Sequence, residues 1–163
     1  MSTCRVYKGI RVVSNTLGLM GHSLFQSGAP LAARMRPRSL ADVLGQDQAL
    51  TPGAPLQLLA KPQAPGASGS SVVLWGPPGT GKTSIARAIA NSSGRKFMEL
   101  SAVSSGVKDI REVIEKARID QEVYGLSTIL FLDEIHRFSK AQQDALLPSV
   151  EAGVIILIAA TTE

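Results

Sequence analysis

Eight consecutive residues, Gly76 to Thr83, have the types and the spacing that bind a polyphosphate. They read Gly76-Pro77-Pro78-Gly79-Thr80-Gly81-Lys82-Thr83, which fits the phosphate-binding loop pattern G-x-x-x-x-G-K-[ST]. Glycines at Gly79 and Gly81 let backbone N–H groups turn toward the phosphates without a side chain in the way. Lys82 supplies a positive charge for the β- and γ-phosphates, and the Thr83 hydroxyl is a ligand for Mg²⁺. The octet therefore predicts a polyphosphate site that also binds Mg²⁺.

Two acids and two threonines are the other candidates for chemistry. Asp133 and Glu134 directly follow the apolar run 128–132, and Thr161 and Thr162 end a second apolar run. Ligands gather at the carboxyl ends of parallel strands, so we expect these residues near the phosphate loop. Asp133 is expected to hold Mg²⁺ through water, and Glu134 to orient or deprotonate the attacking water. The alternatives are a solvated acidic turn and, for the threonines, ordinary strand residues.

The surrounding pattern predicts the elements that position these residues. Apolar runs at 71–75, 96–100, 128–132 and 154–160 are typical of buried strands. A helix is expected from Lys82 to a stop at Gly94, and a second from Gly106 to the break at 124–125. Ser139 precedes Gln142 at capping-box spacing and opens a third helix, which extends to about residue 150. This alternation predicts an open, mostly parallel α/β sheet with helices on both faces, the fold of phosphate-loop NTPases.

Composition describes a globular chain with an uneven charge distribution. Of its 163 residues 44% are hydrophobic and 18% charged, and the single cysteine, Cys4, excludes an internal disulfide and suits a reducing compartment. Residues 1–41 carry six basic and no acidic side chains, while the rest carries 11 basic and 13 acidic ones. The net charge of +4 is thus weak support for a nucleic-acid surface on the body. No stretch has the length of a membrane span.

The chain divides into three parts. Residues 1–28 have no sustained period and are interpreted as a disordered leader or an upstream extension, with Met20 as an alternative start. Their lack of acids also resembles an organelle transit peptide superficially. Residues 29–70 form a linker and connector, with a short capped turn at Ser39 and a short helix near residues 56–59. Residues 71–163 are the predicted core.

Three parts of the sequence resemble the AAA+ ATPase core, in the order found there. Gly76–Thr83 resembles the Walker A motif, Leu130–Glu134 Walker B, and Ala160–Thr162 the end of the sensor-1 strand. Five further stretches are similar to replication-associated recombination protein A, a bacterial family related to the eukaryotic Werner-helicase-interacting ATPase. They are Pro30–Pro37, Val43–Gln46, Leu100–Val103, Gly106–Arg111 and Asp133–Leu147. The resemblance covers residues 29–163.

This resemblance implies a DNA-dependent ATPase acting at stalled replication forks, with ATP and Mg²⁺ as its ligands. Fork or single-strand-containing DNA is the implied partner, other replication proteins are possible partners, and the full-length family forms homo-oligomers in the bacterial cytoplasm at the nucleoid. Catalysis is expected from Lys82, Glu134 and the sensor Thr162, with Thr161 as the alternative sensor. The residues expected to border the adenine are Val43, Leu44, Gly45 and Gln46.

Family members continue through a fifth core strand, an arginine finger and a helical lid, for which this sequence has no counterpart. The resemblance therefore implies that Val72–Trp75 is an unpaired sheet edge. It also implies weak hydrolysis by this chain alone, because an arginine finger contributes about 10³–10⁵ in rate. The alternatives are a nucleotide-binding module without turnover and a Holliday-junction branch-migration motor. Residues 102–111 favour the recombination family over that motor.

Overall fold

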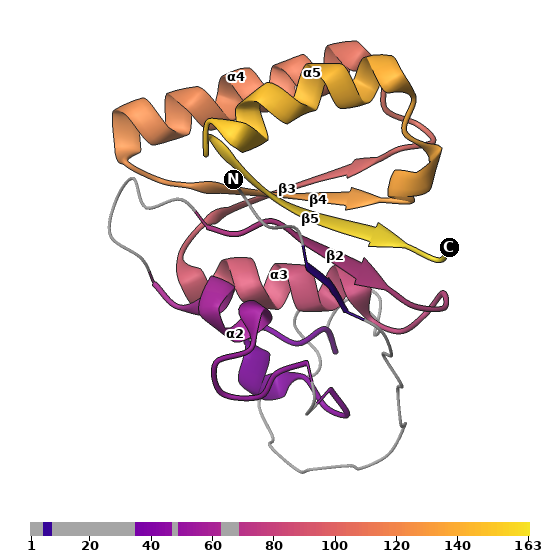
Figure 1. Ribbon diagram of the computed structural model, residues 1–163. Helices are drawn as coiled ribbons and strands as arrows, with labels where there is room; N and C mark the ends of the chain where they lie inside the picture. Colours follow the sequence, from indigo (N-terminus) through magenta and orange to yellow (C-terminus); the bar gives the residue numbers. More distant parts are fainter. Residues whose placement is uncertain (1–4, 8–34, 47–48, 63–68) are drawn as a thin grey trace, which may run out of the picture.

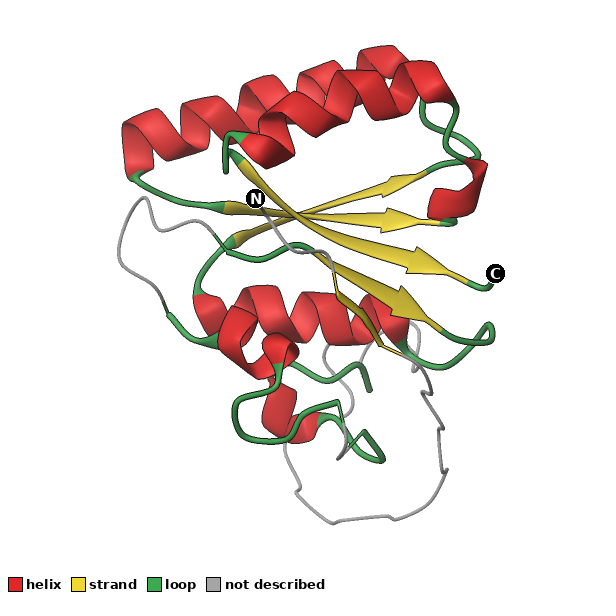
Figure 2. Cartoon of the chain, in the orientation of Figure 1, coloured by secondary structure: helices red, strands yellow, loops and turns green. Residues whose placement is uncertain are grey.

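The computed structural model describes residues 5–7, 35–46, 49–62 and 69–163, which build one parallel sheet with helices on both faces (Figure 1). The strands are β1 (Arg5–Tyr7), β2 (Val72–Trp75), β3 (Lys96–Ser101), β4 (Thr128–Asp133) and β5 (Ile155–Thr161). Their spatial order is β1-β2-β5-β4-β3. Every neighbouring pair is parallel, so all carboxyl ends lie at one edge of the sheet (Figure 2).

Two helical layers cover the sheet. On one face lie α2 (Pro55–Ala60) and α3 (Lys82–Ser93), and on the other α4 (Val107–Tyr124) and α5 (Lys140–Glu151) (Figure 1). Two 3₁₀ turns, η1 (Leu40–Asp42) and η2 (Ile135–Arg137), complete the described elements. The predicted phosphate-loop NTPase fold is confirmed, with strand and helix ends within a few residues of those expected.

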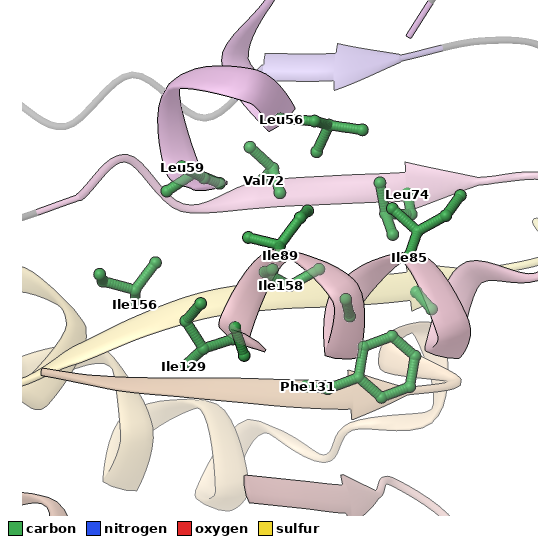
Figure 3. Close-up of a cluster of buried hydrophobic side chains, with 13 residues drawn as sticks. Leu56, Leu59, Val72, Leu74, Ile85, Ile89, Ile129, Phe131, Ile156 and Ile158 are labelled. Carbon is green, nitrogen blue, oxygen red and sulfur yellow. The ribbon is translucent and has the colours of Figure 1, made fainter. Parts of the chain in front are cut away.

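Alternating side chains of β4 belong to two separate hydrophobic cores, one on each face of the sheet. Ile129 and Phe131 pack with α2, α3 and β2 in the cluster of Figure 3, whereas Leu130 and Leu132 pack beneath α4 and α5. All four side chains are fully buried. Period-2 alternation explains the division, because successive strand side chains point to opposite faces. The strand that leads into Asp133 is therefore held rigidly from both sides.

Helix ends follow the chemistry of their terminal residues. Gly94 and Gly125 end α3 and α4 with φ of 70° and 64°, a left-handed conformation that glycine adopts without strain. At the start of α5, Ser139 Oγ accepts from the Gln142 backbone N–H, and the Gln142 amide oxygen accepts from the Ser139 N–H. The predicted capping box is thus confirmed.

The expected unpaired edge at β2 is wrong. β1 runs parallel to β2 with Arg5, Val6 and Tyr7 opposite Val72, Val73 and Leu74. A backbone segment from the N-terminal part of the chain therefore covers the edge, whereas the interpretation of residues 1–28 as a leader stays a prediction. The other residues of that leader, Cys4 and Met20 among them, lie outside the described residues. Of the described helices, none combines the length and the apolarity needed to cross a bilayer.

Candidate nucleotide site

The phosphate loop joins the end of β2 to the start of α3. Gly79 and Gly81 have φ of 77° and 81°, and the helix begins at Lys82 directly after them. The first helical hydrogen bond runs from the Ile85 N–H to the Gly81 carbonyl at 2.9 Å. N–H groups at a helix start lack partners within the helix and point, with the positive end of its dipole, toward an incoming anion.

Lys82 is buried inside this loop. Its ammonium donates to the carbonyls of Gly76 at 2.8 Å and Pro77 at 3.0 Å, and the residue is 8% exposed. The Thr80 hydroxyl donates to the same Pro77 carbonyl at 2.9 Å. Within the described part of the chain no carboxylate forms an ion pair with Lys82. A buried cation with only neutral partners fits a polyphosphate, because a buried charge needs a compensating one.

One backbone hydrogen bond fastens the loop to β5. The Gly76 N–H donates to the Thr161 carbonyl at 3.2 Å, and Trp75 is paired with Thr161 in the sheet. The start of the loop and the predicted sensor segment therefore lie side by side. This is the arrangement expected where the carboxyl ends of adjacent parallel strands meet.

Asp133 is the last residue of β4 and lies at the same edge. Its carbonyl accepts from the Ala102 N–H at 3.0 Å, and its Oδ1 accepts from the Glu134 N–H at 3.1 Å. Among the described residues no group of three His, Cys, Asp or Glu side chains could hold a metal by itself. A metal at this edge would need further ligands from phosphate oxygens or water, which is the usual way proteins bind Mg²⁺. Thr83, the second residue of α3, and Asp133 are the protein groups that fit such a site.

Glu134 has a left-handed backbone. Its φ and ψ are 57° and 44°, and within the described ranges no other non-glycine residue has a positive φ. Residues held in this conformation concentrate at functional sites, where surrounding contacts maintain them. Glu134 Oε2 lies 3.3 Å from His136 Nε2 and 3.4 Å from Arg137 Nε. Two cationic or donor groups of η2 thus hold the carboxylate.

The two threonines differ in environment. Thr161, the last residue of β5, is 7% exposed, and its Oγ1 lies 3.0 Å from His136 Nδ1. Thr162 follows the strand and is half-buried. Successive residues at a strand end direct their side chains to opposite sides, so only one of the two can face the nucleotide. The sensor assignment to Thr162 stays a prediction.

The residues just before the predicted adenine segment are fastened to the C-terminal half of α3. Asn91 Nδ2 donates to the Arg38 carbonyl at 3.2 Å, and the Leu40 N–H donates to Ser92 Oγ at 3.4 Å. Val43 packs against the hydrophobic core between the sheet and helices α2 and α3, whereas Leu44 is 71% exposed. The remaining two residues of the segment are Gly45, with a φ of 74°, and the buried Gln46. Their adenine role stays a prediction.

His136 is the residue whose part in the site was not predicted. The sequence patterns assigned it no role, since no second His or Cys lies at a metal-ligand spacing from it. Its contact with Thr161 depends on η2, a three-residue turn, and on the position of β5, which follows 18 residues later in the sequence. No local pattern predicts such a contact, although the position of His136, two residues after Glu134, makes it a neighbour of the acid pair.

Comparison with known proteins identifies the class. The profile of the ATPase family associated with various cellular activities (AAA) matches residues 72–163, from β2 to the end of the chain. The chain therefore belongs to the AAA family of ATPases. Solved structures agree: the Thermotoga maritima RuvB Holliday junction branch migration motor is 28% identical, with a TM-score of 0.62 over 79% of this chain and 42% of that one.

Within that family the predicted similarity to replication-associated recombination protein A is confirmed. The Escherichia coli K12 protein of that name is 53% identical over 82% of this chain and 29% of its own length. ATPase WRNIP1 of Dictyostelium discoideum is 51% identical over 85% of this chain and 15% of its own. An uncharacterized AAA domain-containing protein of Mycobacterium tuberculosis is 55% identical over 88% of this chain and 31% of its own length. The chain thus spans less than a third of the length of these relatives.

Proposed function

We propose that this chain binds ATP with Mg²⁺ at the carboxyl edge of its sheet and hydrolyses it to ADP and phosphate. The observation that supports this most is the buried Lys82 ammonium, which lies in a glycine loop fastened to β5 and has only carbonyl partners. An anion with several oxygens would replace those carbonyls and neutralise the charge. Gly76–Thr83 is the proposed phosphate cradle.

The acid pair is proposed to serve metal binding and water activation. Mg²⁺, when bound, neutralises charge on the phosphate oxygens, and Thr83 and Asp133 would hold it. Glu134 would orient a water against the γ-phosphate and accept its proton. Its two donors on η2, His136 and Arg137, keep the carboxylate at a fixed place. Thr162 is the proposed sensor, with Val43, Leu44, Gly45 and Gln46 as the proposed adenine border.

The wider function that we propose is that of a DNA-dependent ATPase at stalled replication forks, working as a homo-oligomer in the bacterial cytoplasm. The names of the relatives, which concern replication-associated recombination, support it. A Holliday-junction motor is less well supported, since the RuvB structure shares 28% identity whereas the recombination protein shares 53%. Exposed Arg36 and Arg38 are candidate phosphate contacts for DNA.

Removing the Lys82 charge tests the proposal. In Lys82→Ala the loop loses its only described cation, so we expect the affinity for ATP with Mg²⁺ to fall by about 10- to 100-fold, as for loss of a charged hydrogen bond. Isothermal titration of the purified chain with ATP and MgCl₂ measures this. Lys116→Ala is the matched control, because Lys116 is an exposed lysine of α4, remote from the loop. Equal affinity in wild type and Lys82→Ala would disprove the proposed site.

A further inference from the structure

We propose that His136 is a positioning residue that holds Glu134 in place from the end of β5. This inference rests on the proposed function, because it assigns Glu134 to the attacking water. The imidazole bridges two elements: Nδ1 lies 3.0 Å from Thr161 Oγ1, and Nε2 lies 3.3 Å from Glu134 Oε2. The His136 side chain is 19% exposed, although the residue as a whole faces solvent through its backbone.

The neighbouring contacts favour one direction for each hydrogen bond of the imidazole. Thr161 Oγ1 accepts from the Glu163 N–H at 3.2 Å, so its own proton is free to be donated. Of the two acceptors within reach of that proton, His136 Nδ1 at 3.0 Å is closer than the Glu163 carbonyl at 3.3 Å, so we assign the Thr161 hydroxyl as donor to Nδ1. With Nδ1 as acceptor, a neutral imidazole carries its proton on Nε2 and donates to the Glu134 carboxylate. The opposite tautomer would set a nitrogen lone pair against the carboxylate, which is repulsive.

This bridge is the better protected of the two that hold Glu134. The other donor, Arg137, has a side chain 59% exposed, and exposed ion pairs contribute little because water screens them. Glu134 also has a left-handed backbone, which needs support from its surroundings. His136 supplies that support through its contact with Thr161, at the end of β5. The Thr161 carbonyl in turn accepts a hydrogen bond from the Gly76 N–H of the phosphate loop.

The bridge also distinguishes the two threonines. The Thr161 hydroxyl is engaged by His136 and the backbone of Glu163. A hydroxyl held in this way serves to orient the imidazole. Thr162 is then the threonine left to face the nucleotide, in accord with the sensor assignment proposed above.

Two amide substitutions of His136 test its contact with Thr161 and its contact with Glu134 separately. His136→Gln places an amide near the position of Nε2 and keeps a donor to Glu134, whereas His136→Asn keeps only a partner for Thr161. We expect kcat to fall by about 10- to 100-fold in His136→Asn with KM nearly unchanged, because a misplaced catalytic group costs rate and not ground-state binding. His136→Gln should recover most of that loss. His22→Asn is the control, with wild-type kcat expected.

A double substitution ties the effect to Glu134. In a Glu134→Gln background, His136→Asn should cause no further loss of kcat, because the group that His136 positions is already absent. Equal kcat in wild type and His136→Asn, or a full further loss in the double variant, would overturn the proposal. Unchanged ATP affinity in each variant shows that the fold is retained.

The ¹⁵N spectrum of the imidazoles separates this inference from the proposed function. The chain contains two histidines, so the His22→Asn spectrum identifies the signals of His136. At mildly alkaline pH we expect the Nε2–H tautomer, with an Nδ1 signal that shifts in Thr161→Val. If that pattern is present but ATP is not hydrolysed, the proposed function fails and the contact stands. An averaged pattern of both tautomers that Thr161→Val leaves unchanged overturns the bridge, whatever the hydrolysis rate.

Discussion

Glu134 carries a backbone conformation that costs the folded chain free energy. A left-handed φ and ψ of 57° and 44° costs a residue with a Cβ about 1–2 kcal/mol. The residue lies between the last residue of β4 and η2, where the chain turns sharply. The conformation is stable only because the sheet and η2 fix both sides of it, which is typical of strained residues at functional sites.

Glycine at this position should relieve the strain. We expect Glu134→Gly to have a higher free energy of unfolding than Glu134→Ala, by about 0.5–1 kcal/mol, since glycine adopts this conformation freely but loses more entropy on folding. Both variants lack the carboxylate, so the pair isolates the backbone effect. Urea denaturation followed by circular dichroism measures the difference. A Glu134→Ala variant at least as stable as Glu134→Gly would show that the backbone is not strained.

The conformation of the glycine loop could be predicted from sequence because it depends on spacing within a single turn. Gly79, Gly81 and Lys82 need only the strand before them and the helix after them. His136 could not be predicted, because its role depends on the position of Thr161, on a different strand. Local patterns therefore predict the proposed phosphate cradle better than they predict the contacts that hold Glu134, the proposed catalytic acid.

At the scale of elements, η1 depends on a single carboxylate. Asp42 Oδ2 accepts from the Ser39 N–H at 2.9 Å, the Ser39 hydroxyl at 2.9 Å and the Arg38 N–H at 3.2 Å. The hydrogen bonds from Ser39, its backbone N–H first, lower the pKa of Asp42 from its ordinary value. This turn directly precedes the segment that is proposed to border the adenine.

The lowered pKa of Asp42 predicts how η1 responds to acid. Because the folded pKa lies below the unfolded one, its stabilisation is present above the ordinary aspartate pKa and is lost as pH falls through the lowered value. Hydrogen-exchange protection at Asp42 and Val43, corrected for intrinsic rates, should therefore decrease from about pH 6 to about pH 3 in wild type. In Asp42→Ala the hydrogen-exchange protection of these amides should be low at both pH values. A pH response in Asp42→Ala equal to that of wild type would assign the effect to another group.

The main helices and strands follow from patterns in the sequence, and two short elements do not. Glycines at 94 and 125 and the pair Ser139 and Gln142 mark helix ends that the structure confirms. η2 and β1 have three residues each and no periodicity of their own. Such short elements form through tertiary contacts, which a pattern along the chain does not contain.

At the scale of the whole molecule, β1 completes one side of the sheet. Without it, β2 would expose a row of N–H and C=O groups on an apolar strand, a template for aggregation. Val72 and Leu74 of β2 are buried in the first core, so disturbing this edge also disturbs the strand that leads into the phosphate loop. The short indigo strand beside β2 in Figure 1 thus protects the site indirectly.

Deletion of β1 should expose this edge. We expect removal of residues 1–7 to lower the free energy of unfolding by about 1–3 kcal/mol, from a few lost backbone hydrogen bonds, and to promote aggregation. Removal of residues 1–4 is the matched control, because it leaves β1 in place. Denaturation curves and light scattering compare the two. If both deletions behave alike, β1 contributes nothing to the edge.

We have proposed that the carboxyl edge of the sheet binds ATP and activates water through Glu134. The most direct measurement compares ATP binding and steady-state hydrolysis in wild type and Glu134→Gln, with Mg²⁺ present. We predict unchanged binding and a hydrolysis rate that falls by about 10²- to 10⁴-fold, the contribution of a general base. Equal hydrolysis rates in the two proteins would show that Glu134 does not activate the water.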